Sequence, residues 1–595
     1  MNYVAPVKDM LFAMNELAGL AEISALPGNE EVSADLVETI LDEAGKFATE
    51  VLAPINASGD KEGNAWADGV VSTAKGFKEA YASFCDTGWN GMPASVEFGG
   101  QGLPVTVSTA VLEMWKSANM SFSLCQMLTL GAVEAIAHHA TDELKQIYLP
   151  NMVAGTWTGT MNLTEPQAGS DLAAVRSKAE PRGDGSYAIS GTKIFITWGE
   201  HDMAENIIHL VLARLPDAPP GVKGISLFIV PKFLVNADGS LGERNDLVCA
   251  SIEHKMGIHA SATAVMAFGE KQGAIGYLVG EPNRGLEYMF TMMNHARLNV
   301  GLEGVAISER AYQHALAYAR DRIQGRIVGD KSGEKKPILH HPDVRRMLMD
   351  MKSRTEAGRA LAYYVAGCMD RAKSHPEAQV RASNQARLEL LTPVVKGWCT
   401  EMAQGVTWNG VQVHGGMGFI EETGACQHMR DARITTIYEG TTAIQANDLI
   451  GRKTAKDGGR SMGLLLEDIA ATATELRTAD DAGLTALADS LGRGITALGD
   501  ATQWLLDNYD ANPQAAAAGS VPFLKLTGVV VGGWLMARAA GIAATRVGDS
   551  DGEFYKAKLA TAAYFAQHVM PEAGAYRDAI VNGAEAVLAL AESQF

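Results

Sequence analysis

The chain has 595 residues, of which 47% are hydrophobic and 20% are charged, as in a soluble globular protein large enough for several domains. Its formal net charge of −19 disfavours a polyanion such as nucleic acid as the main partner. The six cysteines include no CxxC pair, which predicts free thiols in a reducing cytoplasm and argues against a disulfide frame or a zinc site.

The N-terminal part of the chain is predicted to be helical. The opening MNYVAPVKDMLFAMNEL has no basic leader before a hydrophobic block, so it does not look like a signal or transit peptide. No stretch approaches the unbroken apolar length of a bilayer span. Apolar residues recur at helical spacing between Ser33, a predicted cap, and Pro54, where that helix is expected to end. We therefore expect residues 1–158 to form an α-helical domain, with 1–32 as an extension, in a cytoplasmic protein.

The pattern changes near residue 158. Short β-branched runs such as NIIHLVLARL and GISLFIVPKFLV, separated by turn signals, predict a middle antiparallel β-domain over 159–280. Long helical runs return over 281–455. After a plausible linker at Lys453–Gly463, an Ala- and Leu-rich block predicts an additional α-helical domain over 464–595. The predicted fold is therefore of the α+β class, and a cleft between the β-domain and the helices is a candidate cofactor site.

The segment MNLTEPQAGSDL contains a loop rich in proline and glycine. In its ordinary interpretation this is a turn in which Asp171 caps a short helical segment. In its functional interpretation the loop presents main-chain amides and the short hydroxyls of Thr164 and Ser170 to a flat ligand. The loop by itself favours the ordinary interpretation.

The segment ISGTKIFITWGE alternates like a β-strand. Phe195 and Thr197 are two residues apart, so they share one face of that strand. An aromatic plate beside a hydroxyl is suited to packing against, and hydrogen-bonding, an isoalloxazine ring. The alternative is that Phe195 belongs to the core, which is the commoner situation for an isolated strand.

The helical segments HARLNVGLEGVA and ARDRIQGR carry arginines in two different settings. Arg297 stands in an apolar stretch whose glycines, Gly301 and Gly304, permit the close approach of another helix or a ligand. Arg322 and Gln324 stand where a long helix is expected to end, in positions suited to phosphate or amide contacts. The alternative for each arginine is a surface ion pair, as is usual on helices.

The segment VQVHGGMGF has adjacent glycines, which allow a backbone to come close to a pyrophosphate or to a neighbouring chain. It lacks the P-loop lysine and the Rossmann spacing, so it is a weak phosphate motif. His414 has no second His or Cys at ligand spacing, which favours a structural role over a metal site.

The segment ITTIYEGTTAIQAND contains one carboxylate, Glu439, followed at once by Gly440. A glutamate beside a glycine is usually a solvated turn residue. Here the neighbours Ile437, Tyr438 and Ile444 are large apolar or aromatic residues, which are unusual around a surface acid. The segment therefore indicates a functional carboxylate.

In this order and at these separations, the motifs resemble the acyl-CoA dehydrogenase family. The similarity also includes GWNGMPASVEFGGQG and HATDELKQIYLPNMVAGTWTGTMNLTEP upstream, and EHKMGIHASATAVMAF, LVGEPNRGL and YEGTTAIQ downstream. It covers the chain from about Ser33 to Arg452. The ending ANDLIGRK and the additional domain are similar to one bacterial subgroup, which includes enzymes for 3-methylmercaptopropionyl-CoA and for fatty acyl-CoA.

The resemblance implies an N-terminal helical domain, a middle β-domain and a C-terminal four-helix bundle, extended here by the additional helical domain. It also implies FAD and the oxidation of an acyl-CoA thioester to the trans-2-enoyl-CoA, with hydride passing from Cβ to flavin N5. Glu439 is the implied base for the α-proton, and burial among apolar neighbours is expected to raise its pKa. Its backbone N–H is expected to hydrogen-bond the thioester oxygen. A minority of the family carries the base one residue before the arginine of HARLNVG, where this chain has Ala296.

Further roles follow from the resemblance residue by residue. The residues expected around the isoalloxazine are Met161, Leu163, Thr164, Phe195, Thr197 and Thr441. Two pairs are expected to reach the rest of FAD, the first at its pyrophosphate or adenine side and the second from a neighbouring subunit: Arg322 with Gln324, and Gln412 with Gly416. The residues expected on the substrate side are Ser170, Asn294, Arg297, Tyr438 and Gly440. Phe195 stands where the family commonly has tryptophan, and Asn294 stands where it often has aspartate.

The resemblance also implies partners. It favours a homodimer, because the additional helices stand where a second dimer packs in smaller tetrameric relatives, and an electron-transfer flavoprotein as electron acceptor. An acyl-CoA oxidase and a long-chain acyl-CoA dehydrogenase remain open alternatives. A DNA-binding damage-response flavoprotein is disfavoured, because residues 461–595 contain eight Lys and Arg against sixteen Asp and Glu. Met127 and Leu128 are candidates for the floor of the acyl pocket, although such helical residues are more often core.

Overall fold

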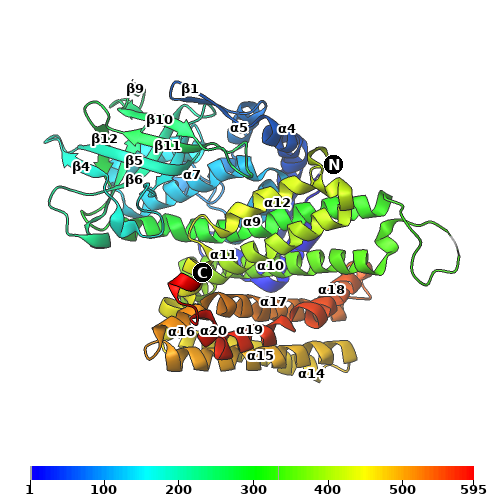
Figure 1. Cartoon of the computed structure of the whole chain (residues 1–595). Coiled ribbons are helices and arrows are strands. Elements are labelled where there is room, and N and C mark those ends of the chain that lie inside the picture. The colour runs from blue at the N-terminus through cyan, green and yellow to red at the C-terminus, as the bar shows by residue number, and fades with distance from the viewer. Residues whose placement is uncertain (1–2, 333) are drawn as a thin grey trace.

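The computed structural model describes residues 3–332 and 334–595, and its elements follow the predicted order of helices, strands and helices. Figure 1 shows the β-domain at one end of the long central helices, with the last helices of the chain as a further layer beneath them. This arrangement confirms the predicted α+β class with an additional helical domain.

The N-terminal domain is built from helices and one short hairpin. Its helices are α1 (Val7–Phe12), α2 (Leu20–Ser24), α3 (Ala34–Phe47), α4 (Asn56–Glu62), α5 (Phe77–Asp86), α6 (Val105–Ala118), α7 (Met120–His139) and α8 (Asp142–Ala154), and the hairpin pairs β1 (Ala65–Ala67) with β2 (Val70–Ser72). Ser33 caps α3 as predicted, because its hydroxyl accepts a hydrogen bond from the backbone N–H of Leu36 at 3.2 Å. The helical path continues beyond α3 as a π-helical turn before it reaches Pro54.

Two helices are long and apolar enough to pass for membrane spans, contrary to the expectation from the sequence. They are α7 and α17 (Ser520–Thr545). In their most apolar windows, 89% and 83% of the residues are buried inside the protein. A helix that packs on all sides needs no polar face, so core position accounts for their composition.

The middle domain is a single large sheet with a small two-stranded sheet beside it. Its strands are β3 (Trp157–Asn162), β4 (Lys178–Pro181), β5 (Tyr187–Thr197), β6 (Asn206–Ala213), β7 (Ser226–Pro231), β8 (Phe233–Val235), β9 (Leu241–Arg244), β10 (Leu247–Ile252), β11 (Thr263–Phe268) and β12 (Ala274–Leu278). The large sheet has the order β10-β11-β5-β12-β7-β6-β3, with β4 also paired to β5. Every residue of β6 and β7 is buried, which explains their continuous apolar runs.

The prediction of an antiparallel domain needs one correction. The pairing of β3 with β6 is parallel, while the other strand pairs are antiparallel among the residues that the structure describes. A parallel pair requires a long crossover, and here the chain from β3 to β6 passes through β4 and β5. Strand direction is therefore set by a long connection that the short-range alternation does not contain.

The central bundle consists of long helices that pack closely. They are α9 (Gly285–Asp321), α10 (Pro342–Ser374) and α11 (Ala378–His414), followed by the shorter α12 (Ala425–Arg433) and α13 (Thr442–Asn447) and a π-helical segment at Asp448–Ala455. A side-chain carbon at Gly301 would stand 2.6 Å from the carbonyl oxygen of Val395, and one at Gly304 would stand 2.4 Å from that of Cys399. The two glycines of HARLNVGLEGVA thus permit the close approach of α11 rather than of a ligand.

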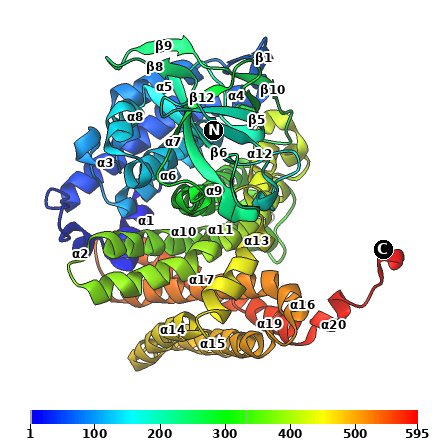
Figure 2. The ribbon, with the colours of Figure 1, turned by 90° about the vertical axis from the view of Figure 1, so that its left-hand side faces the viewer.

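The additional domain packs against the bundle through α17. Its other helices are α14 (Arg460–Thr478), α15 (Ala482–Asn508), α16 (Pro513–Ala518), α18 (Gly552–Tyr564), α19 (Glu572–Asn582) and α20 (Ala584–Val587). Figure 2 shows this layer under α10 and α11, with the C-terminal residues projecting from it. Gly397 faces Leu524, and a carbon added at Gly528 would stand 2.1 Å from the ring of Trp398, so α11 and α17 meet without space between them.

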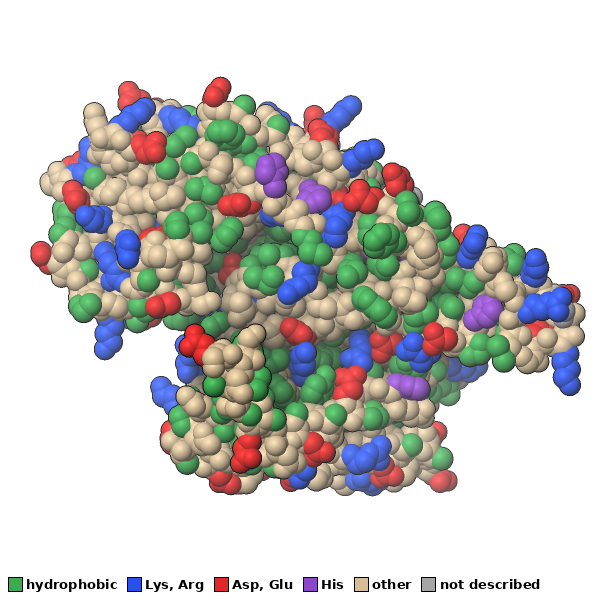
Figure 3. All heavy atoms as spheres, in the orientation of Figure 1, with side chains coloured by type: hydrophobic (Ala, Val, Ile, Leu, Met, Phe, Trp, Pro, Cys, Tyr) green, Lys and Arg blue, Asp and Glu red, His purple; other side chains and the backbone are tan. Residues whose placement is uncertain are grey.

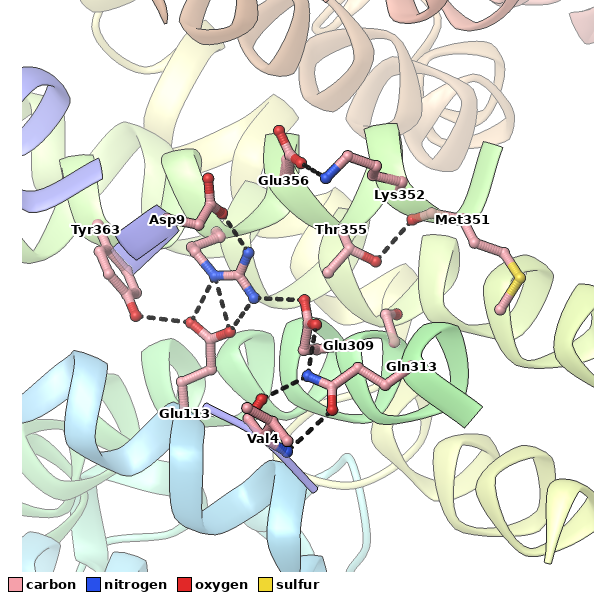
Figure 4. A network of polar contacts seen from close by, with 12 residues as sticks. Val4, Asp9, Glu113, Glu309, Gln313, Met351, Lys352, Thr355, Glu356 and Tyr363 are labelled. Atoms are coloured by element: carbon pink, nitrogen blue, oxygen red, sulfur yellow. Dashed lines mark hydrogen bonds and ion pairs between the residues drawn. The ribbon is translucent and has the colours of Figure 1, made fainter. Parts of the chain in front are cut away.

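A buried network of charges joins the N-terminal extension, the bundle and the additional domain. Arg359 of α10 donates to Asp9 at 2.5 Å, to Glu113 at 2.6 Å and to Glu309 at 2.7 Å. Figure 4 shows these three carboxylates converging from separate helices. Lys558 of α18 pairs with Asp9 as well. Because the guanidinium is almost completely enclosed, its loss leaves several buried carboxylates without their shared cation.

We expect Arg359→Met to lower the free energy of unfolding by about 3–5 kcal/mol, since breaking a buried ion pair leaves an uncompensated charge. Thermal and denaturant melts of the purified protein measure this. The matched control is Arg577→Met, which removes a half-exposed pair with Asp500 and is expected to cost under about 1 kcal/mol. Equal melting temperatures for the two variants would contradict the role given to the network.

Candidate active site

Glu439 lies in a tight turn between the 3-10 turn Ile434–Thr436 and α13. Its φ angle is 54°, in the left-handed region that a residue with a side chain adopts at a cost of about 1–3 kcal/mol. Thr441 caps α13, because its hydroxyl accepts a hydrogen bond from the backbone N–H of Ile444 at 3.4 Å. Such strain persists only where the surroundings enforce it, and it is frequent at active sites.

Two side chains hold this turn by its carbonyl oxygens. Lys396 of α11 donates from Nζ to the carbonyl oxygen of Gly440 at 2.6 Å, and Gln445 donates from Nε2 to that of Glu439 at 3.1 Å. Gly440 has a φ of 88°, and a side-chain carbon there would stand 2.7 Å from Gln445 Nε2. Only glycine fits this position, so the sequence Glu-Gly follows from the shape of the turn.

The electrostatics of Glu439 suit a base near neutral pH. Burial raises the pKa of its carboxyl to about 7, while the cations of Lys396 and Arg297 oppose the rise and the carboxylate of Glu303 adds to it. Burial also lowers the pKa of Lys396 to about 8, against the raising effect of Glu439. The side chain of Glu439 keeps partial access to solvent, so a ligand can reach it. A carboxyl with this pKa takes a proton far more readily than an ordinary glutamate.

Arg297 on α9 lies among polar and aromatic partners and is almost completely buried. Its Nη1 donates to Asn294 Oδ1 at 3.4 Å and stands 3.6 Å from Asp448 Oδ2, and its guanidinium lies 5.8 Å from the ring centroid of Phe290. The structure thus brings together two of the residues predicted for the substrate side, Asn294 and Arg297.

A cavity of about 510 Å³ opens beside these residues. Its walls come from α7, α9, α10, α11 and the π-helical segment, and they include Phe290, Asn294, Arg297, Thr392, Asp448 and Arg452. A space of this size falls within the range of ligand pockets. Figure 3 shows, on one face, that the molecule is hollowed between the β-domain and the helices, with apolar side chains gathered at the edge of the hollow.

Two donors near the base have no partner within residues 3–332 and 334–595. Arg297 Nε is buried without a hydrogen bond, and no hydrogen bond uses the backbone N–H of Glu439. An unpaired buried donor costs free energy unless a ligand satisfies it. Arg297 Nε meets this condition, and the N–H of the partly exposed Glu439 is free to donate to an acceptor atom of a bound molecule.

Phe195 is displayed on β5 rather than packed in the core. Its side chain is 60% exposed and its φ is 59°, so it is both strained and unpacked. The pairing of β5 with β11 shifts register between Ala264 and Met266, where β5 carries the extra residue of a bulge. A bulge re-aims side chains and often lies beside a binding site. This exposure argues against the interpretation of Phe195 as a core residue. It favours the interpretation in which its aromatic face packs against a flat ring system.

Four of the other residues predicted for the isoalloxazine lie in the β-domain with Phe195, whereas Thr441 lies in the turn after Glu439. The backbone N–H of Ile194 donates to the carbonyl of Thr164 at 2.9 Å, and Lys193 Nζ donates to the carbonyl of Leu163 at 3.1 Å. Met161 is on β3, just before them, and Thr197 is two residues after Phe195 on β5. Ser170 is exposed in the loop that follows Thr164, and its surroundings do not indicate which ligand atom it would contact.

The second predicted group lies elsewhere in the chain. Arg322 is the C-terminal cap of α9, which starts beside β7 and rises over about 55 Å at 1.5 Å per residue. Gln324, Gln412 and Gly416 are exposed near the same end of the bundle. His414, which lies between Gln412 and Gly416 in the chain, is buried. Its ring centroid is 4.5 Å from that of Tyr318, which agrees with a structural role. This group therefore lies at the end of α9 opposite to the end that adjoins β7.

Three charged residues near the base escape the sequence analysis: Lys396, Glu303 and Lys116. Each is completely buried. Lys396 and Glu303 each stand as a single charge in a mostly apolar helical run, in LLTPVVKGWC and NVGLEGVA, and Lys116 shares its run only with Glu113. Lys and Glu are almost never fully buried unless they are paired, so that pattern is the signal that was available.

Four family models match consecutive parts of the chain. They are described as the acyl-CoA dehydrogenase N-terminal domain (residues 35–156), middle domain (160–270) and C-terminal domain (283–453), and an acetyl-CoA dehydrogenase C-terminal-like domain (465–591). Together they span the four predicted regions in the predicted order.

Named relatives and solved structures agree with these matches. A 3-methylmercaptopropionyl-CoA dehydrogenase of Ruegeria pomeroyi is 51% identical over 99% of both chains, and a butyryl-CoA dehydrogenase of Syntrophomonas wolfei is 36% identical over 96% of this chain and 95% of its own. A broad-specificity linear acyl-CoA dehydrogenase of Mycobacterium tuberculosis is 34% identical over the whole of both.

Two solved structures show the same fold over nearly the whole chain. Caenorhabditis elegans ACDH-11 in complex with C11-CoA has a TM-score of 0.76 at 18% identity and covers 98% of this chain and 96% of its own. An acyl-CoA dehydrogenase from Bacillus anthracis complexed with FAD has a TM-score of 0.74 at 21% identity, with coverages of 95% and 92%.

Proposed function

Since the chain belongs to the acyl-CoA dehydrogenase family, whose FAD-dependent members convert acyl-CoA to enoyl-CoA, we propose that Glu439 is the base of this reaction. The observation that carries the proposal is a carboxyl with a pKa of about 7, strained into a turn that Lys396 holds. Ala296, at the alternative position of the base, is an alkyl group and takes no proton.

The chemistry of this chain's residues follows from their geometry. Glu439 takes the α-proton of the thioester, and negative charge then grows on the thioester oxygen. The unpaired backbone N–H of Glu439 is the donor proposed for that oxygen, and it gains strength as the charge develops. Gly440 leaves room for the acyl group, and the nearby cation of Arg297 favours the ionised carboxylate.

FAD supplies the acceptor for the hydride that leaves Cβ. The residues proposed to hold its ring are the exposed Phe195, the adjacent Leu163 and Thr164, and, with them, Met161, Thr197 and Thr441. Arg322, Gln324, Gln412 and Gly416 are proposed to hold the remainder. Their position at the far end of α9 supports a homodimer, because a second subunit is then needed to complete each site.

The proposed substrate is 3-methylmercaptopropionyl-CoA or another short- or medium-chain acyl-CoA. The 51% identical relative is named for the former, and the 36% identical relative is named for butyryl-CoA. Long-chain acyl-CoA is the alternative that the substrate series below tests. We further propose the cytoplasm as the location of the enzyme and an electron-transfer flavoprotein as the acceptor of its electrons.

Two other functions are DNA binding, which the charge of the protein disfavours, and acyl-CoA oxidation with oxygen as acceptor, which an assay distinguishes. The additional domain has twice as many acidic as basic residues, which opposes duplex DNA binding. On the face in Figure 3, basic and acidic side chains are interspersed without a continuous basic band. An oxidase is distinguished by peroxide release: rapid peroxide formation with substrate and no added acceptor would replace the dehydrogenase proposal.

We expect Glu439→Gln to lower the rate of flavin reduction by acyl-CoA at least about 10³-fold, because the side-chain amide accepts no proton near neutral pH. The protein should remain yellow, since no contact of FAD is removed. Stopped-flow absorbance of the flavin measures the rate. Reduction near the wild-type rate would contradict the assignment of the base.

The activity should rise with pH, because only the ionised form of Glu439 is a base. With a pKa of about 7 in the free enzyme, kcat/KM should climb about tenfold per pH unit below that value and level off above it. Lys396→Met removes a cation that lowers this pKa, so the rise should move to higher pH. An unmoved profile would show that Lys396 does not act on the base. Lys558→Met, which removes a buried lysine of α18 in the additional domain, is the matched control.

The preference for the methylthio group can be measured directly. Pentanoyl-CoA has a methylene where 3-methylmercaptopropionyl-CoA has sulfur, so the pair compares the group at constant length. We expect kcat/KM to favour the sulfur compound by about 10-fold or less, since a pocket discriminates weakly between such similar groups. A strong preference for pentanoyl-CoA would remove the sulfur compound as the proposed substrate.

A further inference from the structure

A second buried set of polar groups adjoins the base on the side of Tyr438. The hydroxyl of Tyr438 donates to Glu303 Oε2, and the other oxygen of Glu303 accepts from Lys116 Nζ at 3.1 Å. Lys116 and Glu303 have no exposed surface. The three residues come from α6, α9 and the turn that carries Glu439. We call Lys116, Glu303 and Tyr438 the end-wall triad.

Stability alone does not account for the end-wall triad. Replacing a buried ion pair by packed apolar residues is often neutral or stabilising, so a buried pair is weak evidence of a structural need. Burial lowers the pKa of Lys116 and raises that of Tyr438, which records the cost of enclosing them. Groups kept at such a cost beside an active base point to a role in the reaction or in substrate choice.

The triad lies beyond the base when followed along α9. Arg297 lines the cavity, and Glu303 is six residues further on, about 9 Å along the helix axis at 1.5 Å per residue. Tyr438 precedes Glu439 in the chain and its hydroxyl reaches Glu303, so the triad adjoins the turn that carries the base. A thioester that reaches Glu439 from the side of Arg297 meets Glu303 if its acyl chain continues along α9.

The far side of the triad is closed by α7. Lys116 Nζ lies 3.5 Å from the sulfur of Met127, and Met127 and Leu128 are both buried in that helix. The ammonium cannot swing away, because Glu303 is its charged partner and no solvent reaches it. An ion pair fixed in this way is a rigid obstacle to an alkyl chain.

We propose that the end-wall triad closes the acyl site and restricts it to short acyl chains, refusing long alkyl chains by the bulk of its ion pair. The proposal rests on the proposed function of Glu439. A long chain can extend past Tyr438 only by displacing Lys116 and Glu303 from each other, which leaves buried charges unpaired. Rejection by a built-in clash, rather than by better contacts to short chains, is the basis of this selectivity.

The wild-type enzyme gives the first test. Flavin reduction is followed with butyryl-, hexanoyl-, octanoyl- and palmitoyl-CoA, and kcat/KM should fall at least about 100-fold between butyryl- and octanoyl-CoA. Octanoyl-CoA oxidised within about threefold of butyryl-CoA would overturn the proposal, whatever the variants do. Failure of every thioester to reduce the flavin would instead overturn the proposed function.

The variants test the obstacle itself. K116A/E303A removes both charges and their volume, so the ratio of butyryl- to octanoyl-CoA activity should narrow at least about tenfold. E303Q keeps the volume of Glu303 and an oxygen that can accept from Lys116, but it removes the ion pair, so its ratio should narrow less than that of K116A/E303A. Flavin content and melting temperature verify that each variant is folded. An unchanged ratio in folded K116A/E303A, or an equal narrowing in E303Q, would overturn the proposal.

Discussion

Two side chains hold the turn that carries Glu439, and the stronger contact is the charge-assisted hydrogen bond from the buried ammonium of Lys396 to a backbone carbonyl. Lys396 holds Gly440, and through it Glu439 stays in a left-handed conformation that would otherwise relax. Lys396 is in turn fixed by its helix. The next two residues of α11, Gly397 and Trp398, pack against α17 of the additional domain. The additional domain therefore supports the helix that carries the lysine, so an element far from the reacting atoms helps to set their geometry.

Burial and nearby cations act in opposite directions on the pKa of Glu439, the proposed base. Burial alone would favour a neutral carboxyl, and a neutral carboxyl accepts no proton. Lys396 and Arg297 oppose this effect, and the resulting pKa of about 7 keeps a substantial ionised fraction at neutral pH. A fully solvated glutamate would be ionised but a weak base. Partial burial beside two cations gives both properties.

Sequence patterns predict this fold well, and they also single out Glu439 as the proposed base, because both signals are local properties of the chain. The apolar neighbours of Glu439 are visible in the sequence itself. Hydrophobic residues that recur with helical or alternating spacing mark the four regions. The bulge that exposes Phe195 depends on its pairing with β11, about seventy residues away, so an alternating strand does not reveal it. The roles of Lys396 and Glu303 cannot be recognised from the sequence for a similar reason. A lone charge in an apolar run becomes meaningful only when tertiary contacts supply its partner.

Chain length and base strength are connected through Glu303. The same carboxylate accepts from Tyr438, pairs with Lys116 and raises the pKa of Glu439. A change that enlarges the acyl site by removing Glu303 therefore also removes a negative charge near the base and weakens it. Loss of Lys116 has the opposite electrostatic sign, because it leaves Glu303 unbalanced. A sequence that takes longer chains must consequently change both members of the pair, which keeps the charge around Glu439 constant.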